Sequence, residues 1–446
     1  MTAFGFGAVD AEAVIGTVVN PAGLTLAKVV PASRAAHFAD PGLGASPTWH
    51  GFAIDRAGIA FTDEISVVGD QRIRIDLDAL RVIDSGLAWA PGQFYDRSAE
   101  PVAACTRGAL RRVESRLAQA GLRALVGHEI EFLLVDPAGG RLPAGVWAPY
   151  GAAGVLEYED FIRDVLNALG GAGVGVEQFH PEYGVNQFEL SLAAQSPVAA
   201  ADQLVLGRIL VSRVARRHGV RVCLSPAAFP GGVGSGAHQH FSLHRGDTPL
   251  FGGGSGDHDL TGGLTREGRA AIAGVVSGLT EAELLLCGSI VSGLRLKPGN
   301  WAGAYVCWGT ENREAAVRFI PGTRDDPQAA NVEVKAVDPS ANPYLATAAI
   351  LGLALDGIEQ ALALQPEIRV DPDALTDAER AAAGVGRLTG NQVVALDALD
   401  RSHRLRAILG DPVIDAVLAV RSYEQRNYAD LGQQDLADRF RMAWSL

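Results

Sequence analysis

The chain has 446 residues, of which 48% are hydrophobic and 20% are charged, and its formal net charge is −13. This share of apolar residues excludes a disordered acidic tail protein. The acidic balance, without a basic stripe, argues against a nucleic-acid partner. Only three of the 38 basic residues are lysines, at positions Lys28, Lys297 and Lys335. The length predicts two domains, or one large domain with an appendage.

Cysteine usage and hydropathy bear on the compartment. The four cysteines are widely spaced and form no CxxC pair, so buried free thiols are expected and not a disulfide framework. The longest apolar run, residues 344–355, is shorter than the ~20 residues that a membrane-spanning helix needs. The first residues lack the pattern of a secretory signal. We therefore expect a cytoplasmic protein without a membrane partner.

The N-terminal part of the chain is rich in strand patterns. β-branched residues bounded by turn signals predict several short strands. Their ranges are 14–19, 58–62, 65–68 and 73–75. Apolar residues at spacings of three and four then predict a helix over 100–120, with Pro101 near its start and Gly121 as its stop. We place a domain boundary before this helix, which divides the chain into residues 1–100 and 101–446.

Strand and helix patterns alternate after the boundary. A buried strand is predicted over 124–136. Helices are predicted over 161–168, 201–218, 270–287, 343–364, 411–428 and 435–444. Glycine-rich loops are predicted over 231–236 and 252–256. A small strand-rich part followed by a large mixed part indicates an α+β fold.

Two segments place pairs of carboxylates in apolar surroundings. Glu129 and Glu131 lie two residues apart in the predicted strand 124–136, so both point to one face. Burying like charges in this way is costly unless a cation neutralises them. Glu182 and Glu189 flank a turn that could bring them to one point. The structural alternatives are a solvated sheet edge for the first pair and an ordinary polar hairpin for the second.

A glycine-rich loop leads into a strand that carries two histidines. The amides of the loop 231–236, which contains Gly234, could cradle an anion. His238 and His240 project from one face of the strand that follows. Taken alone this pattern is weak, because a hydrogen-bonded core histidine is commoner than a ligand.

Basic side chains recur further along the chain. Arg295 begins an Arg-Leu-Lys-Pro-Gly motif, and Arg313 and Arg318 are separated by five positions. An arginine set among apolar residues, as Arg318 is, needs a carboxylate or a phosphate, and a structural salt bridge is the alternative. Glu333 and Lys335 share one face of another predicted strand.

Together these motifs supply carboxylates, imidazoles and guanidinium groups from separate strands of one apolar domain. Carboxylate-rich ligation with one or two imidazoles suits Mg²⁺ or Mn²⁺ better than Zn²⁺. Arginines neutralise charge on a transferring phosphoryl group. The sequence contains neither a Walker loop nor a GxGxxG after a strand, so a P-loop or Rossmann site is not expected. A site for divalent metals and a nucleotide phosphate chain is predicted.

Five segments resemble the glutamine synthetase family in order and spacing. GHEIEF resembles its Glu-x-Glu strand, Glu182 and Glu189 its pair of glutamates seven apart, and GSGAHQHFSL its Gly-Ser-Gly-x-His-x-His loop. The other two segments are WGTENREAAVRF and VEVKAVDPSANPYLATAAILGLALDGIE. The likeness covers residues 105–446, and residues 16–30 read like the family's first hairpin. It implies an N-terminal β-grasp domain, then a catalytic domain with a curved antiparallel sheet and helices.

The resemblance implies a role for each matching residue. One Mg²⁺ or Mn²⁺ ion would be held by Glu131, Glu182 and Glu189. A second ion would be held by Glu129, His238 and Glu333. The phosphates of ATP and the acyl phosphate would be contacted by Arg313 and Arg318, and the nucleotide side would be lined by His240 and Ser242. The substrates would be bound by Arg295 and Gly234, and we expect Trp301 and Lys335, which replace other residues of the family, to contact them as well.

The chain departs from the family pattern where the family handles ammonium and glutamate. Trp301 stands in place of the ammonium-handling glutamate, and residues 44–47 lack the aspartate of the family's Asp-Gly-Ser-Ser stretch. Val233 replaces a glutamate-binding asparagine, and Lys335 stands where most members have arginine, which costs bidentate geometry. Residues 364–370 lack the tyrosine that is adenylylated in one bacterial subgroup.

These departures favour the family's γ-glutamylamide branch. In the family reaction, ATP phosphorylates the γ-carboxylate of glutamate, and an amine then displaces phosphate. Trp301 offers an apolar, cation-attracting wall to an organic amine, a polyamine or an alkylamine. The alternatives are a glutamine synthetase that uses ammonium, a non-catalytic structural or regulatory relative, and a ligase whose acid is not glutamate. By analogy we expect a homo-dodecamer of two hexameric rings, in which the small domain of one subunit completes its neighbour's site.

Overall fold

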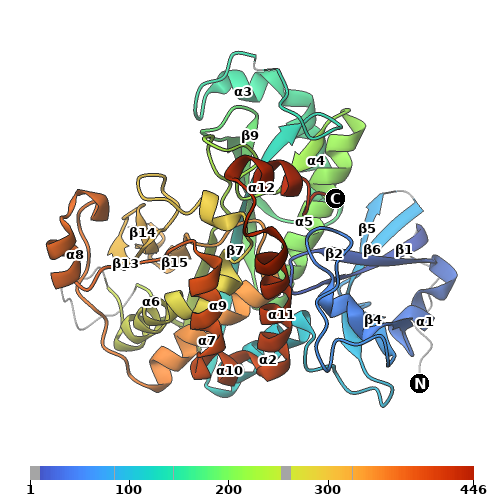
Figure 1. Cartoon of the computed structure of the whole chain (residues 1–446), viewed down its shortest axis with the longest axis horizontal. Coiled ribbons are helices and arrows are strands. Elements are labelled where there is room, and N and C mark those ends of the chain that lie inside the picture. Colours follow the sequence, from blue (N-terminus) through green and yellow to red (C-terminus); the bar gives the residue numbers. More distant parts are fainter. Residues whose placement is uncertain (1–10, 85, 144, 253–262, 324) are drawn as a thin grey trace.

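Two β-sheets, with helices packed around the larger one, make up the computed structural model (Figure 1). It describes residues 11–84, 86–143, 145–252, 263–323 and 325–446. Of the predicted loop 252–256, only Gly252 is among these residues. The α+β prediction is confirmed. All four cysteines are free and buried, and none of the described helices is long and apolar enough to cross a bilayer.

The N-terminal sheet has six strands. They are β1 (Ala11–Val19), β2 (Thr25–Pro31), β3 (Leu43–Ala45), β4 (Gln71–Ile75), β5 (Arg81–Asp84) and β6 (Gly86–Tyr95). The order is β2-β1-β6-β4-β3, with β5 beside β6. β1 and β6 run parallel, and the other described pairs are antiparallel. The short helices of this part are η1 (Ala32–Arg34), α1 (Ala35–Ala39) and η2 (Pro47–Gly51).

Two strands predicted in this part, 58–62 and 65–68, are wrong. These residues form a loop whose turns are closed by side chains. The carboxylate of Asp55 and the hydroxyl of Thr62 each accept the backbone N–H three residues further on, at 2.7 and 2.9 Å. Such local hydrogen bonds give the backbone an alternative to a strand ladder.

The larger sheet has ten strands and carries the residues of interest. They are β7 (Leu122–Val135), β8 (Val176–Pro181), β9 (Gln187–Gln195), β10 (Arg221–Cys223), β11 (Gln239–Arg245), β12 (Thr248–Pro249), β13 (Tyr305–Thr310), β14 (Ala315–Ile320), β15 (Asn331–Val334) and β16 (Gly386–Arg387). The order is β16-β13-β14-β15-β11-β7-β9-β8, with β10 beside β7 and β12 beside β11. The pairs are antiparallel as expected, except that β13 and β14 run parallel.

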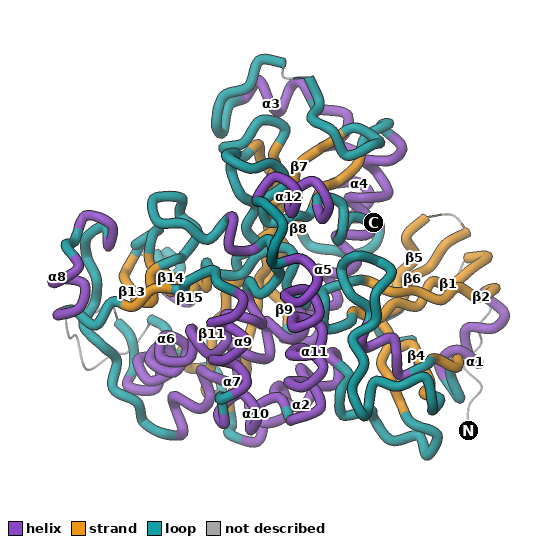
Figure 2. Tube along the Cα trace, in the orientation of Figure 1, coloured by secondary structure: helices purple, strands orange, loops and turns teal. Residues whose placement is uncertain are grey.

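Helices lie around this sheet (Figure 2). They are α2 (Thr106–Gln119), α3 (Ala152–Glu157), α4 (Glu159–Gly171), α5 (Pro197–Arg217), α6 (Arg266–Leu286), η3 (Ser292–Leu294), η4 (Pro327–Ala329), α7 (Pro343–Glu359), η5 (Pro372–Ala374), α8 (Asp377–Ala382), α9 (Gln392–Asp400), α10 (His403–Leu409), α11 (Asp411–Tyr428) and α12 (Gln433–Phe440). The long helices overlap the predicted ranges, because their apolar stripes are regular. However, α2 begins at Thr106 instead of residue 100, since Pro101 forms a bridge with Tyr95, and α7 ends at Glu359 instead of residue 364.

The main hydrophobic core extends across the predicted boundary at residue 100. Val19 and Trp89 of the N-terminal sheet are buried in the same apolar cluster as the helices of the larger part. The indole N–H of Trp444, near the chain end, donates to the carbonyl of Ala22 at 3.0 Å. The division into residues 1–100 and 101–446 stays a prediction.

Candidate active site

The register of three neighbouring strands sets three chelating side chains in one row. His180 on β8 lies directly opposite Glu189 on β9, and Glu189 lies opposite Glu131 on β7. Directly opposed residues in an antiparallel pair point to the same face, with Cβ atoms about 5 Å apart. Strand register therefore brings Glu131 and Glu189, which the resemblance assigns to one metal position, to the same face of the sheet.

A second row crosses the adjacent strands. His240 on β11 lies opposite Glu333 on β15, which lies opposite Arg318 on β14. Because the two rows belong to one sheet, carboxylates, imidazoles and a guanidinium face a common space. The sheet thus brings together residues up to 204 positions apart in the chain, Glu129 on β7 and Glu333 on β15.

The glycine-rich loop 231–236 delivers His238 to this space. The carbonyls of Gly236 and His238 accept the backbone N–H groups of Glu131 and Glu129, each at 3.0 Å, which continues the β7 ladder. A Cβ at Gly236 would lie 2.6 Å from Nε2 of His238 and 2.9 Å from Oε1 of Glu131. A side chain at this position would displace these groups, so glycine suits the close approach of the loop to the carboxylates.

The side chains line a cavity of about 1100 Å³. Residues on its wall that the sequence predicted are Glu129, Glu131, Glu182, Glu189, Gly234, His238, His240, Arg295, Trp301, Arg313, Arg318, Glu333 and Lys335. Ser242, predicted for the nucleotide side, lies two residues beyond His240 on β11 and is not among the described lining residues. The wall also contains His180, to which the sequence analysis gave no role.

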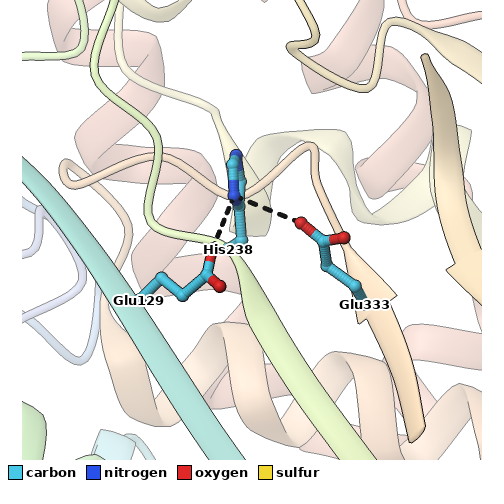
Figure 3. Close-up of side chains that lie close together, drawn as sticks. All are labelled: Glu129, His238 and Glu333. Carbon is cyan, nitrogen blue, oxygen red and sulfur yellow. Dashed lines mark hydrogen bonds and ion pairs between the residues drawn. The ribbon is translucent and has the colours of Figure 1, made fainter. Parts of the chain in front are cut away.

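One group of possible metal ligands matches the second predicted set (Figure 3). Nδ1 of His238 lies 2.9 Å from Oε2 of Glu129 and 3.2 Å from Oε1 of Glu333. Burial raises the pKa of Glu333, but Lys335 and His238 outweigh it and lower the pKa to about 2. This group therefore carries ionised carboxylates, which are suited to a divalent cation.

The first predicted set is arranged differently from the expectation. Its members fall into two overlapping groups, one of Glu131 and Glu189 with His238 and one of Glu182 and Glu189 with His180. Burial, followed by the charge of Glu131, raises the pKa of Glu182 to about 7. Like-charged carboxylates that face one another in this way are neutralised by protons or by a cation, and their oxygen-rich donor set fits Mg²⁺ or Mn²⁺.

His240 belongs to the same polar network. Its Nε2 lies 3.1 Å from Oε1 of Glu129, and its Nδ1 lies 2.9 Å from Oδ1 of Asn331. Burial lowers the pKa of His240, but the hydrogen bond to Glu129 and its charge outweigh burial and raise the pKa to about 9. In the absence of a metal, His240 therefore supplies positive charge beside Glu129.

Two cations hold Glu333 and two further ones face the cavity. Arg318 donates to Oε2 of Glu333 at 3.2 Å and Lys335 donates to Oε1 at 3.1 Å. Arg318 also forms an ion pair with Glu311, which the sequence analysis did not single out. The buried guanidinium of Arg295 donates to the carbonyl of Lys335 at 3.2 Å. Arg313 also lies at the wall, so four cationic side chains line the same cavity as the carboxylates.

Trp301 stands at the cavity wall in a strained conformation. Its φ is 51°, which is unusual for a residue other than glycine, and the residue is 51% exposed. Its backbone N–H donates to Oε1 of the buried Glu314 at 2.8 Å. The guanidinium carbon of Arg313 lies 5.8 Å from the centroid of the indole ring. Burial raises the pKa of Glu314.

Two other departures from the family pattern, Val233 and residues 44–47, lie in different parts of the structure. Val233 is on the cavity wall, 41% exposed. Residues 44–47 run from β3 to the start of η2 in the N-terminal part and are not among the described residues that line the cavity. A Cβ at Gly44 would lie 3.2 Å from Oδ1 of Asp70, so this segment has a carboxylate beside it in space although its own sequence lacks one.

The chain is similar to known proteins of one family. A family model described as "Glutamine synthetase, catalytic domain" matches residues 103–436. The gamma-glutamylpolyamine synthetase of Streptomyces coelicolor is 40% identical over 438 residues, which cover 96% of this chain and 92% of that protein. The glutamine synthetase of Mycobacterium tuberculosis is 31% identical over 359 residues, 77% of this chain and 79% of the relative.

Solved structures show the same architecture. A crystal structure described as a novel glutamine synthase homolog superimposes with a TM-score of 0.85 at 29% identity, over 97% of this chain and 99% of that one. A complex of GmaS with ADP superimposes with a TM-score of 0.82 at 24% identity, over 95% of both chains, and supports the fold alone.

Proposed function

The chain belongs to the glutamine synthetase family, and we propose that it is an ATP-dependent ligase that joins the γ-carboxylate of glutamate to an organic amine. The amine is a polyamine or an alkylamine. The 40% identity to a gamma-glutamylpolyamine synthetase over nearly the full length supports this assignment. The observation that carries the choice of amine over ammonium is Trp301, which puts an indole at the cavity wall.

The reaction has two steps. The γ-phosphoryl group of ATP is transferred to the γ-carboxylate of glutamate, which gives ADP and γ-glutamyl phosphate. The amine nitrogen then attacks the acyl carbon, the C–O bond to phosphate breaks, and the nitrogen loses a proton. The products are a γ-glutamylamide, ADP and phosphate. Both steps bring anions together, so positive charge has to be supplied by the site.

The chain supplies part of this charge from its own side chains. Arg313 and Arg318 neutralise phosphate oxygens, and Arg295, held by backbone carbonyls, orients a carboxylate of glutamate. Two Mg²⁺ or Mn²⁺ ions, bound by the ligand sets around Glu131 and Glu129, would polarise the γ-phosphate and offset its charge. The buried position of His238 and Glu333 keeps water away from these contacts.

We extend the proposal to assembly and location. Residues 44–47 lie outside the described wall of the chain's own cavity, which suits a homo-dodecamer of two hexameric rings in which that segment faces a neighbour's site. Light scattering coupled to gel filtration tests the assembly. A ligase that consumes ATP and glutamate is placed in the cytoplasm, where both are abundant.

The proposed activity is tested by identifying the product. The protein is incubated with ATP, Mg²⁺, glutamate and one of several amines, and the products are analysed by mass spectrometry. The expected product has the mass of glutamate plus the amine less one water, and it forms only when ATP is present. Hydrolysis of ATP without any amide product, or no turnover with any acid and amine, would contradict the proposal.

A further inference from the structure

We infer that His180 is a ligand of the metal ion that Glu182 and Glu189 hold, so that each of the two metal positions contains one imidazole. The inference rests on the metal-binding part of the proposed function. It adds a nitrogen ligand to a set in which the family resemblance implies only carboxylates. His238 would be the imidazole of the other position.

The backbone places His180 for this role. His180 and Glu189 are directly opposed on β8 and β9, so the sheet sets both side chains on one face. Nε2 of His180 lies 3.3 Å from Oε1 of Glu189, and one ligand atom each of His180, Glu182 and Glu189 all lie within 4.8 Å of one another. Adjacent ligands at ~2.1 Å from an octahedral ion lie about 3 Å apart, so little movement is needed to close this group around a cation.

A hydrogen bond orients the imidazole ring. Nδ1 of His180 lies 3.1 Å from the carbonyl oxygen of Pro181, which accepts its proton. Metal-bound histidines commonly donate their other ring N–H to a carbonyl in this way, because the bond fixes the tautomer and the ring orientation. This hydrogen bond turns Nε2 toward the carboxylate of Glu189, so that a lone pair of Nε2 and a lone pair of the carboxylate oxygen face each other. A cation satisfies both atoms.

The surroundings restrict the ring further. The centroids of the Tyr150 and His180 rings are 6.0 Å apart, and His180 is on the wall of the cavity, open to an entering ion. Glu131, by contrast, is held by the side-chain amide of Gln187 at 3.1 Å and faces His238. Glu182 shares a group of possible metal ligands with Glu189 and His180.

Pulsed electron paramagnetic resonance of bound Mn²⁺ tests the inference directly, because it detects the nitrogen of a coordinated imidazole. Mn²⁺ is added to the full-length protein at one and then two equivalents, without nucleotide or amine. The variants are His180→Gln and His238→Gln. The matched control is Gln178→Ala, whose side chain lies on the same strand and wall but bonds to Ser191 at 3.1 Å.

We expect nitrogen modulation from both Mn²⁺ ions of the unaltered protein. His180→Gln should remove it at one ion and weaken that ion's binding at least ~10-fold in a Mn²⁺ titration, while Gln178→Ala should change neither. Unchanged modulation and both Kd values within twofold in His180→Gln would overturn the inference and make His180 only a charged neighbour of the carboxylates.

If His180→Gln does not fold, the unaltered protein decides the question alone. Nitrogen modulation at both ions supports the inference, and modulation at a single ion contradicts it. None of these measurements involves amine or ATP, so a negative result leaves the proposed ligase activity standing. Loss of the ligase activity, in turn, leaves the metal result unaffected.

Discussion

The ammonium group of Lys335 donates a hydrogen bond to Oε1 of Glu333 at 3.1 Å, and both side chains are buried. Lys335 is one of only three lysines in the chain. Arg318 approaches the other carboxylate oxygen of Glu333 at 3.2 Å. The charge of a proposed metal ligand is therefore already balanced before any ion binds, and an entering ion competes with the two side chains.

This relationship leads to a prediction about Lys335→Met. Removing the ammonium leaves a buried carboxylate with one cation fewer, so the free energy of unfolding of the metal-free protein should fall by about 1–3 kcal/mol. Mn²⁺ should raise the melting temperature more in this variant than in the unaltered protein, because a competitor is gone. Lys335→Arg is the control, and an equal or smaller Mn²⁺ effect in Lys335→Met would contradict the account.

A second prediction concerns the contribution of Trp301 to the preference for an organic amine over ammonium. Trp301→Glu should raise kcat/KM for ammonium and lower it for the preferred amine, each about 10-fold, because a carboxylate replaces an apolar, cation-attracting ring. Trp301→Phe keeps an aromatic ring and the same backbone strain, and should retain the amine preference. If the ratio of ammonium to amine turnover is the same in all three proteins, Trp301 does not select the nucleophile.

Glu314 is expected to position Trp301 without touching substrate. Its carboxylate accepts the N–H of Trp301 at 2.8 Å from a buried position. Glu314→Ala should raise KM for the amine about 10-fold, since a hydrogen bond to a charged group contributes about 1.5 kcal/mol, and should leave Mn²⁺ binding unchanged. Glu314→Gln keeps an acceptor oxygen and serves as control. An unchanged KM in Glu314→Ala would count against this role.

Stability should depend on pH through the buried His128. Burial lowers the pKa of His128 to about 3, below its usual value of 6.5. The unfolded chain therefore binds a proton that the folded chain does not. The resulting stability is complete above pH 6.5 and is lost as the pH falls, by about 2 kcal/mol between pH 6.5 and pH 5.

Denaturant unfolding of the metal-free protein at several pH values measures this effect. His128→Leu should flatten the slope of unfolding free energy against pH in that interval, whatever its effect on absolute stability. His37 is exposed, so His37→Leu should keep the slope of the unaltered protein. A slope that is equal in His128→Leu and the unaltered protein would contradict the assignment.

Much of the site was predictable because it lies on regular strands. The spacing of Glu129 and Glu131 indicates a shared face, and the structure places both on β7 at the cavity. The helix predicted over 411–428 has the bounds of α11, Asp411–Tyr428, because its apolar stripe and flanking residues agree. Local pattern and tertiary packing favour the same structure in these segments.

The features that the sequence did not predict depend on strand register and on contacts between residues far apart in the chain. The role of His180 arises from its pairing with Glu189 across two strands, which no local pattern reveals. The position of Asp70 beside Gly44 and the ion pair of Arg318 with Glu311 likewise join residues whose contact depends on the folded chain. The parallel pairing of β13 and β14 is of the same kind, since side-chain alternation does not reveal strand direction.

The central claim is that the nucleophile is an organic amine. A comparison of kcat/KM for ammonium, monoalkylamines, diamines and polyamines, measured as phosphate release at saturating ATP, Mg²⁺ and glutamate, tests it most directly. The account predicts at least one organic amine with kcat/KM well above that of ammonium. Phosphate release with ammonium far faster than with every amine of the panel would contradict it and identify the protein as a glutamine synthetase.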